Sequence, residues 1–272
     1  MLAKRVLVAV VLLPIGIFAI VYGGAVFAGL VVLILGLAAW EYVNLFRAGG
    51  LQPAGVILVL GTFAFALGRA LDGFESAPWL VSLAILVVMA YHLIAFERGS
   101  EQSGTDFGVT LGGIFYLGWI GAYLISLRDL PDGMWWVLLV LPAVWLADSG
   151  AYFIGKGIGK HHITPRLSPK KTWEGYLGGI LIGTLGTTLL AYGLAFLAGS
   201  ESALTPLRGA LLGFILSALT ILGDLGESMF KRQVGIKDSS NLIPGHGGVF
   251  DRIDSWLWAG VIGYYVILWG FY

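Results

Sequence analysis

Long apolar stretches recur along the whole chain, and short polar connections separate them. A helix that crosses a membrane needs about 20 mostly apolar residues. About nine stretches approach or exceed that length, at 5–22, 25–46, 53–71, 78–96, 108–127, 134–154, 174–198, 207–229 and 255–272. We therefore predict an all-α, polytopic transmembrane protein with about nine transmembrane helices, forming a single integral membrane domain over 1–272. Residues 1–133 would supply N-terminal helices, and 134–272 the catalytic helices and loops.

Individual stretches differ in quality. The third is short, rich in glycine and interrupted by Arg69. The first follows Lys4 and Arg5 and could be a signal peptide, but an uncleaved span is favoured because the next apolar run begins a few residues later. In the seventh, Gly175, Gly179 and Gly183 recur every four residues, which predicts close packing against another helix.

Basic residues predict the orientation, because cytoplasmic loops of membrane proteins are enriched in Lys and Arg. If the N-terminus is cytoplasmic, nine spans leave only Arg69, Arg128 and Arg208 of the 16 Lys and Arg residues on the other side. We therefore expect a bacterial-type inner-membrane protein whose N-terminus and long polar loops are cytoplasmic.

Composition supports a membrane protein and excludes several kinds of site. Only 12% of residues are charged and 58% are hydrophobic, whereas about 25% are charged in soluble domains. The net charge is zero, so nothing suggests a nucleic-acid partner. There is no cysteine, which excludes disulfides, zinc-thiolate sites and a thiol nucleophile.

Charged residues concentrate in one late stretch, 221–254. Asp224, Glu227 and Ser228 share one helix face at i, i+3 and i+4, and an acid at membrane depth is a candidate functional residue. A structural ion pair with Lys231 or Arg232 is the alternative.

Asp251 and Asp254 repeat the i, i+3 spacing where the last span begins. Oxygen groups of this kind suit Mg²⁺, which combines one or two carboxylates with water and substrate phosphate. For either acid alone, a favourable interaction with the helix dipole is the alternative.

The linker 237–250 between these acid pairs has the composition of an ordered loop. Pro244, Gly245, Gly247 and Gly248 permit tight turns and exposed amides. Among them, His246 could contact a phosphate or a base, carry a proton, or simply pack within the loop.

A second polar loop, 155–173, is basic. Its Ser168-Pro169 could begin a helix, so that Lys170 and Lys171 meet a polyphosphate. Its glycine-lysine start lacks the spacing of a Walker A motif, and Lys156 and Lys160 fit lipid headgroups better. Two acids lie elsewhere: Asp148 precedes this loop, and the isolated Glu41 is predicted to make an internal contact between helices.

These residues together indicate a membrane enzyme that binds divalent metal and phosphate at its cytoplasmic face. The pattern of 228–254 also resembles the signature of the phosphatidate cytidylyltransferase (CDP-diacylglycerol synthase) family. That signature reads S-x-x-K-R, four residues, K-D, a spacer, then H-G-G-x-x-D-R-x-D. Here its positions are Ser228, Lys231, Arg232, Lys237, Asp238, His246, Gly247, Gly248, Asp251, Arg252 and Asp254. The segments 148–152 (DSGAY) and 168–175 (SPKKTWEG) match a second feature of the family.

The resemblance implies a reaction in which CTP and phosphatidic acid give CDP-diacylglycerol and pyrophosphate, with Mg²⁺, in a membrane-embedded homodimer in contact with lipids. It implies Asp224 and Asp251 as metal ligands, and a catalytic set of Asp224, Ser228, Asp251 and Asp254. The substrate-binding residues it implies are Lys170, Lys171, Lys231, Arg232, Lys237, Asp238, His246 and Arg252. Whether a monovalent cation joins Mg²⁺ stays open.

Two other functions fit part of the pattern. A CTP-dependent polyprenol or dolichol kinase would use the same groups on another lipid. A transporter would use Asp148, Asp224 and Glu227 as an ion relay, but it predicts acids near the bilayer midplane and paired broken helices. Here the acids gather at one predicted membrane face beside long basic loops.

Overall fold

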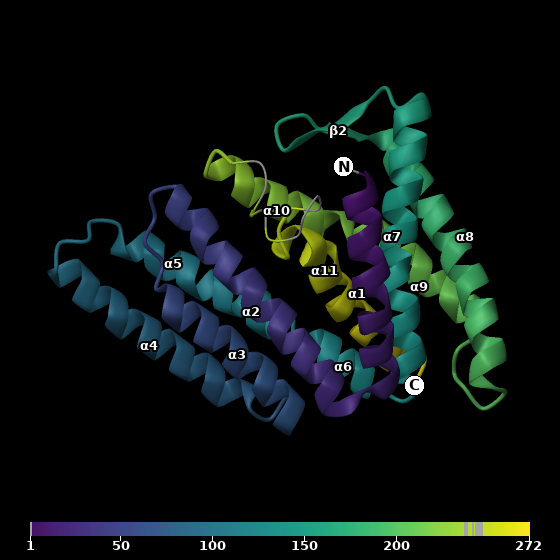
Figure 1. Ribbon diagram of the computed structural model, residues 1–272, viewed down its shortest axis with the longest axis horizontal. Helices are drawn as coiled ribbons and strands as arrows, with labels where there is room; N and C mark the ends of the chain where they lie inside the picture. Colours follow the sequence, from purple (N-terminus) through teal and green to yellow (C-terminus); the bar gives the residue numbers. More distant parts are fainter. Residues whose placement is uncertain (1, 237–238, 241, 243–246) are drawn as a thin grey trace. The chain divides into compact units, whose positions relative to one another are not determined.

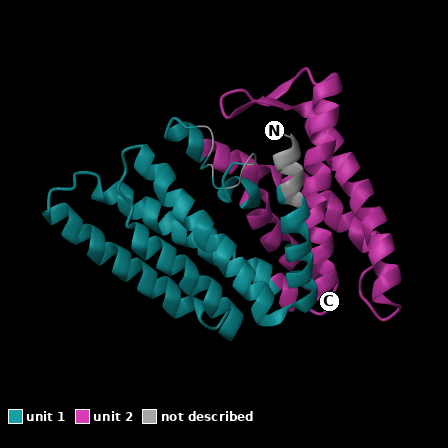
Figure 2. Ribbon diagram, viewed as in Figure 1, with its two compact units in different colours: residues 1–126, 230–253 teal, residues 127–229, 254–272 magenta. Residues whose placement is uncertain are grey.

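The chain forms two compact units. The computed structural model describes residues 2–236, 239–240, 242 and 247–272. One unit combines residues 1–126 with 230–253, and the other combines 127–229 with 254–272 (Figure 2). We call them unit 1 and unit 2. The chain passes from one unit to the other within α6, α10 and α11. The division of function near residue 133 stays a prediction.

Both units are built from helices, with one small hairpin in unit 2 (Figure 1). Unit 1 contains α1 (Leu2–Tyr22), α2 (Gly24–Ala48), α3 (Gly55–Asp72), α4 (Ala77–Glu97), α5 (Ser103–Gly113) and the π-helix η1 (Ile114–Ile120). Unit 2 contains α7 (Gly133–Ile158), β1 (His162–Thr164), β2 (Ser168–Thr172), α8 (Trp173–Ala198) and α9 (Pro206–Leu219). The helices α6 (Tyr123–Asp129), α10 (Ile221–Gln233) and α11 (Phe250–Gly270) contribute to both.

Every apolar stretch predicted to span the membrane contains helix. Seven spans in the described part of the chain are long and apolar enough to cross a membrane. They are α2, α3, α4, Ser103–Asp129, α7, α8 and Pro206–Gln233. The chain is therefore an all-α integral membrane protein in its main architecture, while the count of nine crossings stays a prediction. Pro206–Gln233 is divided at Thr220, whose hydroxyl donates to the carbonyl of Leu216 (2.8 Å).

The prediction that Ser168-Pro169 begins a helix is wrong. Ser168–Thr172 forms strand β2, which pairs antiparallel with β1. The helix α8 begins at Trp173, directly after β2, where the hydroxyl of Thr172 accepts from the amide of Gly175 (3.2 Å). A threonine cap satisfies one of the amides that every helix start leaves without a partner, so the helix begins after Thr172.

The glycine stripe of α8 packs as predicted. A Cβ on Gly175 or Gly179 would lie 2.8 Å from a backbone carbonyl of α7, and a Cβ on Gly183 would overlap Ser217 of α9. Because glycine has no side chain, α8 approaches both neighbours closely within unit 2.

A cluster of aromatic rings in unit 1 surrounds the end of α10 and the start of α11. The ring of Tyr42 on α2 lies 5.8 Å from Phe230 and 6.0 Å from Phe250 in edge-to-face contacts. Tyr116 of η1 contacts the same two rings. These contacts hold the end of α10 and the start of α11 against α2 and η1.

Arg69 does not interrupt α3. Its side chain is 3% exposed, and its guanidinium stacks on Phe74 (3.6 Å), Trp119 (4.6 Å) and Tyr123 (4.8 Å). It also donates to the hydroxyl of Ser126 (2.8 Å). Cation–π attraction is strongest where the charge is shielded from water, so an arginine can lie inside this apolar helix bundle.

We predict that Arg69→Ala destabilises the detergent-solubilised protein. Loss of a desolvated cation–π site costs about 2 kcal/mol, which corresponds to a fall of roughly 4–8 °C in melting temperature. Intrinsic tryptophan fluorescence during heating would measure it. The matched control is Arg98→Ala, because Arg98 is exposed. Equal melting temperatures for the two variants would contradict the stabilising role of Arg69.

Candidate active site

Three carboxylates meet in unit 2. Asp224 and Glu227 come from α10 and Asp254 from the second turn of α11, and one ligand oxygen of each lies within 4.8 Å of the others. Glu227 is 2% exposed and Asp254 8%. We call these residues the acid triad. Three oxygen donors at this spacing, two of them buried, form a group that a hard divalent cation can occupy.

A glycine allows the two helices of the acid triad to approach. A Cβ on Gly223 would lie 2.5 Å from the carbonyl oxygen of Asp254, which is closer than side-chain atoms pack. Glycine at this position therefore brings the start of α10 against the start of α11. The i, i+3 spacing then turns Asp224 and Glu227 toward the same side.

The hairpin between α7 and α8 places a lysine beside the acid triad. The Lys171 ammonium on β2 lies 2.5 Å from the Asp224 carboxylate, while the neighbouring Lys170 is exposed. Ser228 donates to the other Asp224 oxygen (3.3 Å). Glu174 stabilises the base of the hairpin by accepting from the amides of Lys160 (3.0 Å) and His161 (3.2 Å). A basic loop remote in sequence is thus fixed beside Asp224.

Asp251 lies in unit 1 and has a different environment. One of its oxygens accepts from the Lys231 ammonium (2.8 Å). The other accepts from the amide of Gly248 (2.7 Å) and from the amide (3.2 Å) and hydroxyl (2.8 Å) of Ser239. Its side chain is 6% exposed. Asp251 therefore organises the loop before α11 and holds a lysine at the same time.

Glu41 holds the other side of this loop. It is fully buried in α2 and accepts from Ser239, Ser240, Val249 and Phe250. The sequence predicted an internal contact between helices. The contact is internal, but it joins α2 to a loop and to the first amides of α11. No sequence motif marks Glu41, and its only signal is an acid inside an apolar span.

The remaining predicted site residues fall into two groups. Arg232 at the end of α10 and Arg252 in α11 have exposed side chains, as does Asp148 in α7. Lys237, Asp238 and His246 lie outside the described residues.

The metal prediction paired Asp224 with Asp251. Among the described residues, the group of ligand oxygens contains Asp224 with Glu227 and Asp254. Glu227 shares the predicted face with Asp224 but was not among the predicted ligands. Asp251 belongs to unit 1, and its role as a ligand stays a prediction.

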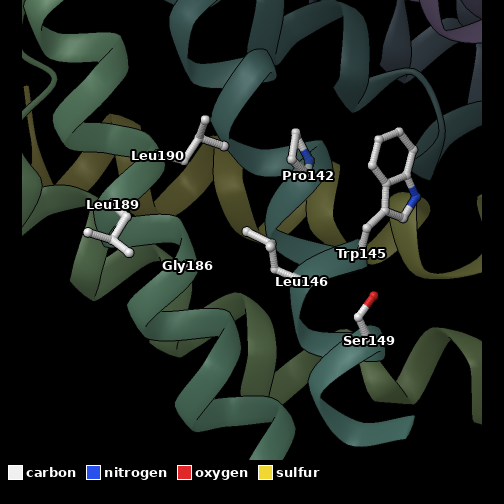
Figure 3. A pocket seen from close by; sticks show the side chains of 7 residues that line it. All are labelled: Pro142, Trp145, Leu146, Ser149, Gly186, Leu189 and Leu190. Carbon is white, nitrogen blue, oxygen red and sulfur yellow. The ribbon is translucent and has the colours of Figure 1, made fainter. Parts of the chain in front are cut away.

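An apolar pocket of about 490 Å³ opens between α7 and α8 in unit 2 (Figure 3). Trp145 and Leu146 line it from α7, and Leu189 and Leu190 from α8. Ser149 gives the lining one hydroxyl. A lining of this kind fits an apolar group such as a hydrocarbon chain. The charged residues of the candidate site in unit 2 are those of the acid triad.

Comparison with known proteins decides the family. The sequence model of the Cytidylyltransferase family matches residues 3–269. The chain belongs to this family. It is 39% identical to the phosphatidate cytidylyltransferase of Pseudomonas aeruginosa, over 99% of this chain and 97% of that protein. It is 30% identical to the phosphatidate cytidylyltransferase of Bacillus subtilis, over 97% of each.

Membership of the cytidylyltransferase family agrees with the resemblance found in the sequence. The motif residues Ser228, Lys231, Asp251 and Asp254 all make or neighbour the contacts described above. Glu227, Ser239, Ser240 and Glu41 lie outside the fixed positions of that motif, yet they take part in the same two clusters. The motif therefore includes only some of the residues that form these two clusters.

We predict that Gly223→Ala disturbs the acid triad. The added methyl would overlap the α11 backbone, and overpacking of this kind costs about 1–3 kcal/mol. The variant should melt at a lower temperature and bind Mn²⁺, used as a paramagnetic probe, more weakly than the original protein.

Gly193→Ala is the control, since a Cβ there meets nothing within 4 Å. An exposed glycine in a helix costs about 0.5–1 kcal/mol relative to alanine, so this variant should be slightly more stable with unchanged Mn²⁺ binding. Identical behaviour of the two variants would refute the close approach at Gly223.

Proposed function

We propose that this chain is a phosphatidate cytidylyltransferase, which transfers CMP from CTP to phosphatidate and yields CDP-diacylglycerol and pyrophosphate. The observation that carries the proposal is the acid triad with Lys171 on Asp224, in a chain that aligns over almost its full length with phosphatidate cytidylyltransferases. Carboxylates beside cationic side chains are what phosphoryl-type transfer requires, because the reaction depends on charge neutralisation and positioning.

The acid triad fits Mg²⁺. Its donors are all carboxylate oxygens, which are the ligands this ion prefers, and three residues leave room for water or substrate phosphate. We propose Asp224, Glu227 and Asp254 as residues that hold the ion, with Asp251 as the further ligand expected from the sequence. When bound, Mg²⁺ would neutralise phosphate oxygens of the nucleotide. A second, monovalent cation is part of the same proposal.

The basic residues would bind the anionic groups of both substrates. Lys171 and Lys231 each lie against a carboxylate, so both are held in place before phosphate arrives. Lys170, Arg232 and Arg252 are exposed and can reach a triphosphate or a lipid headgroup. We include Lys237, Asp238 and His246 from the motif as further substrate contacts.

The chemistry needs no strong general base. A phosphatidate phosphate oxygen is already anionic and attacks the α-phosphorus of CTP. A new P–O–P linkage forms, the bond from the α-phosphorus to the bridging oxygen of the β-phosphate breaks, and pyrophosphate leaves with that electron pair. The protein's task is to align the two substrates and to stabilise the charge on the leaving group.

The setting of the reaction follows from its substrates. Phosphatidate lies in the bilayer and CTP is cytosolic, so we propose an inner-membrane enzyme whose N-terminus and polar loops face the cytoplasm. We further propose that it works as a homodimer surrounded by membrane lipids. The apolar pocket beside Trp145 is consistent with a lipid-facing surface.

A labelling experiment tests the function. The purified protein with Mg²⁺, phosphatidate and [α-³²P]CTP should produce labelled lipid, and [γ-³²P]CTP should not. Label from the γ position in lipid would indicate a lipid kinase. Ion flux in liposomes without nucleotide turnover would indicate a transporter. Absence of phosphatidate-dependent pyrophosphate release would overturn the proposal.

Substitution of the acid triad tests the site. We predict that Asp254→Asn and Asp224→Asn each lower CMP transfer at least about 100-fold, because even the loss of an outer-shell partner costs 10–100-fold. Asp251→Asn should also abolish transfer while the protein still inserts. Asp72→Asn, at an exposed position, should keep full activity. Full activity of Asp254→Asn would show that the acid triad has no role in CMP transfer.

A further inference from the structure

The buried acid Glu41 has no place in the proposed chemistry, yet it accepts four hydrogen bonds from the loop before α11 and from the first residue of that helix. Its Oε1 accepts from the amide of Val249 (2.9 Å) and the hydroxyl of Ser240 (2.5 Å). Its Oε2 accepts from the amide of Phe250 (2.7 Å) and the hydroxyl of Ser239 (3.3 Å). Each oxygen thus receives one backbone amide and one serine.

The two amides bound by Glu41 lie at the start of α11. Phe250 is the first residue of the helix and Val249 precedes it. The first amides of a helix have no partner within it, and a negative charge there interacts favourably with the helix dipole. Glu41 therefore caps α11 from α2, across more than 200 positions of sequence.

The contacts of Glu41 continue to Asp251. Ser239 lies between the two carboxylates, with its hydroxyl 3.3 Å from Glu41 and 2.8 Å from Asp251. Gly248 donates its amide to Asp251 (2.7 Å), and a Cβ on Gly248 would overlap Ser239 and Glu41. The orientation of Asp251 thus depends on a loop whose other side rests on Glu41.

We propose that Glu41 is a positioning residue for the loop before α11: through Ser239 and the first amides of α11 it fixes the orientation of Asp251. This inference rests on the proposed function for the role of Asp251. It predicts that a change at Glu41 reaches the reaction through metal and nucleotide binding, beyond any loss of general stability.

The geometry requires a carboxylate at this position. Both oxygens accept from backbone amides. Glutamine has the same shape but only one acceptor oxygen, so Glu41→Gln would place an NH₂ group against an N–H donor. A buried donor left without an acceptor is costly. Aspartate keeps the charge but is shorter by one methylene, so Glu41→Asp should restore only part of the effect.

The experiment compares Glu41→Gln with Asp106→Asn. Asp106 is also buried in unit 1 and accepts from a backbone amide, that of Gln52 (2.7 Å), but none of its described contacts involves the loop before α11. Both variants exchange a buried carboxylate for an amide. Melting temperature would report the general cost of that exchange. Mn²⁺ binding followed by electron paramagnetic resonance, and hydrogen exchange of the peptide containing 247–252, would report the loop.

We expect Glu41→Gln to weaken Mn²⁺ binding by about 10–100-fold, as loss of outer-shell partners does, and to accelerate exchange in 247–252. Asp106→Asn should change neither. Equal Mn²⁺ affinity and equal exchange in the two variants would overturn the inference. If Glu41→Gln fails to fold, Ser240→Ala, which removes one donor to Glu41, replaces it with the same readouts and a smaller expected shift.

A double substitution tests the route through Ser239. If Glu41 acts on Asp251 through this serine, Glu41→Gln and Ser239→Ala should be non-additive, so that the double variant loses less Mn²⁺ affinity than the two single losses combined. Additive losses would place Glu41 outside that route. Inactivity of the unsubstituted protein with CTP and phosphatidate would reject the proposed function alone, since the Mn²⁺ and exchange readouts do not require turnover.

Discussion

A carboxylate buried in an apolar protein needs donors, and this requirement shapes both polar clusters of the chain. An unpaired buried charge is far more costly than a hydrogen-bonded one. Asp251 receives two amides and a lysine, and Glu41 receives two amides and the hydroxyl of Ser240. The one hydroxyl proton of Ser239 lies between the two carboxylates, nearer Asp251 (2.8 Å) than Glu41 (3.3 Å). The loop before α11 takes its form from supplying those donors. The helices around the loop are apolar and offer few hydrogen-bond donors, so the loop itself must provide the donors for these carboxylates.

Each of the two clusters also contains its own counter-charge. Lys171 lies on Asp224 in unit 2, and Lys231 lies on Asp251 in unit 1. Pairing of this kind limits the charge repulsion among acids gathered at one site. It also keeps two flexible side chains ordered, which lowers the entropy lost when they contact a phosphate.

Local sequence patterns predicted what depends on local contacts. Apolar runs located the helices, and the i, i+3 spacing placed Asp224 and Glu227 on one face, as the acid triad has them. The role of Glu41 could not be read in this way, because its partners lie 198–209 residues away. The apolar run placed the start of α8 correctly, but strand β2 before it was not predicted, because its partner strand β1 is only three residues long. The break at Thr220 left no sign in the hydropathy.

The residues that contact Arg69, namely Phe74, Trp119, Tyr123 and Ser126, bear on how the chain enters the bilayer during synthesis. Arg69 lies in the last turn of α3, and an arginine within a membrane-spanning helix opposes insertion, most strongly at the bilayer centre. Its partner Ser126 lies 57 residues further along, and Trp119 and Tyr123 also follow α4. Most of the residues that contact Arg69 are therefore synthesised after α3. The final environment of Arg69 therefore depends on the segment Ser103–Asp129, which is synthesised later.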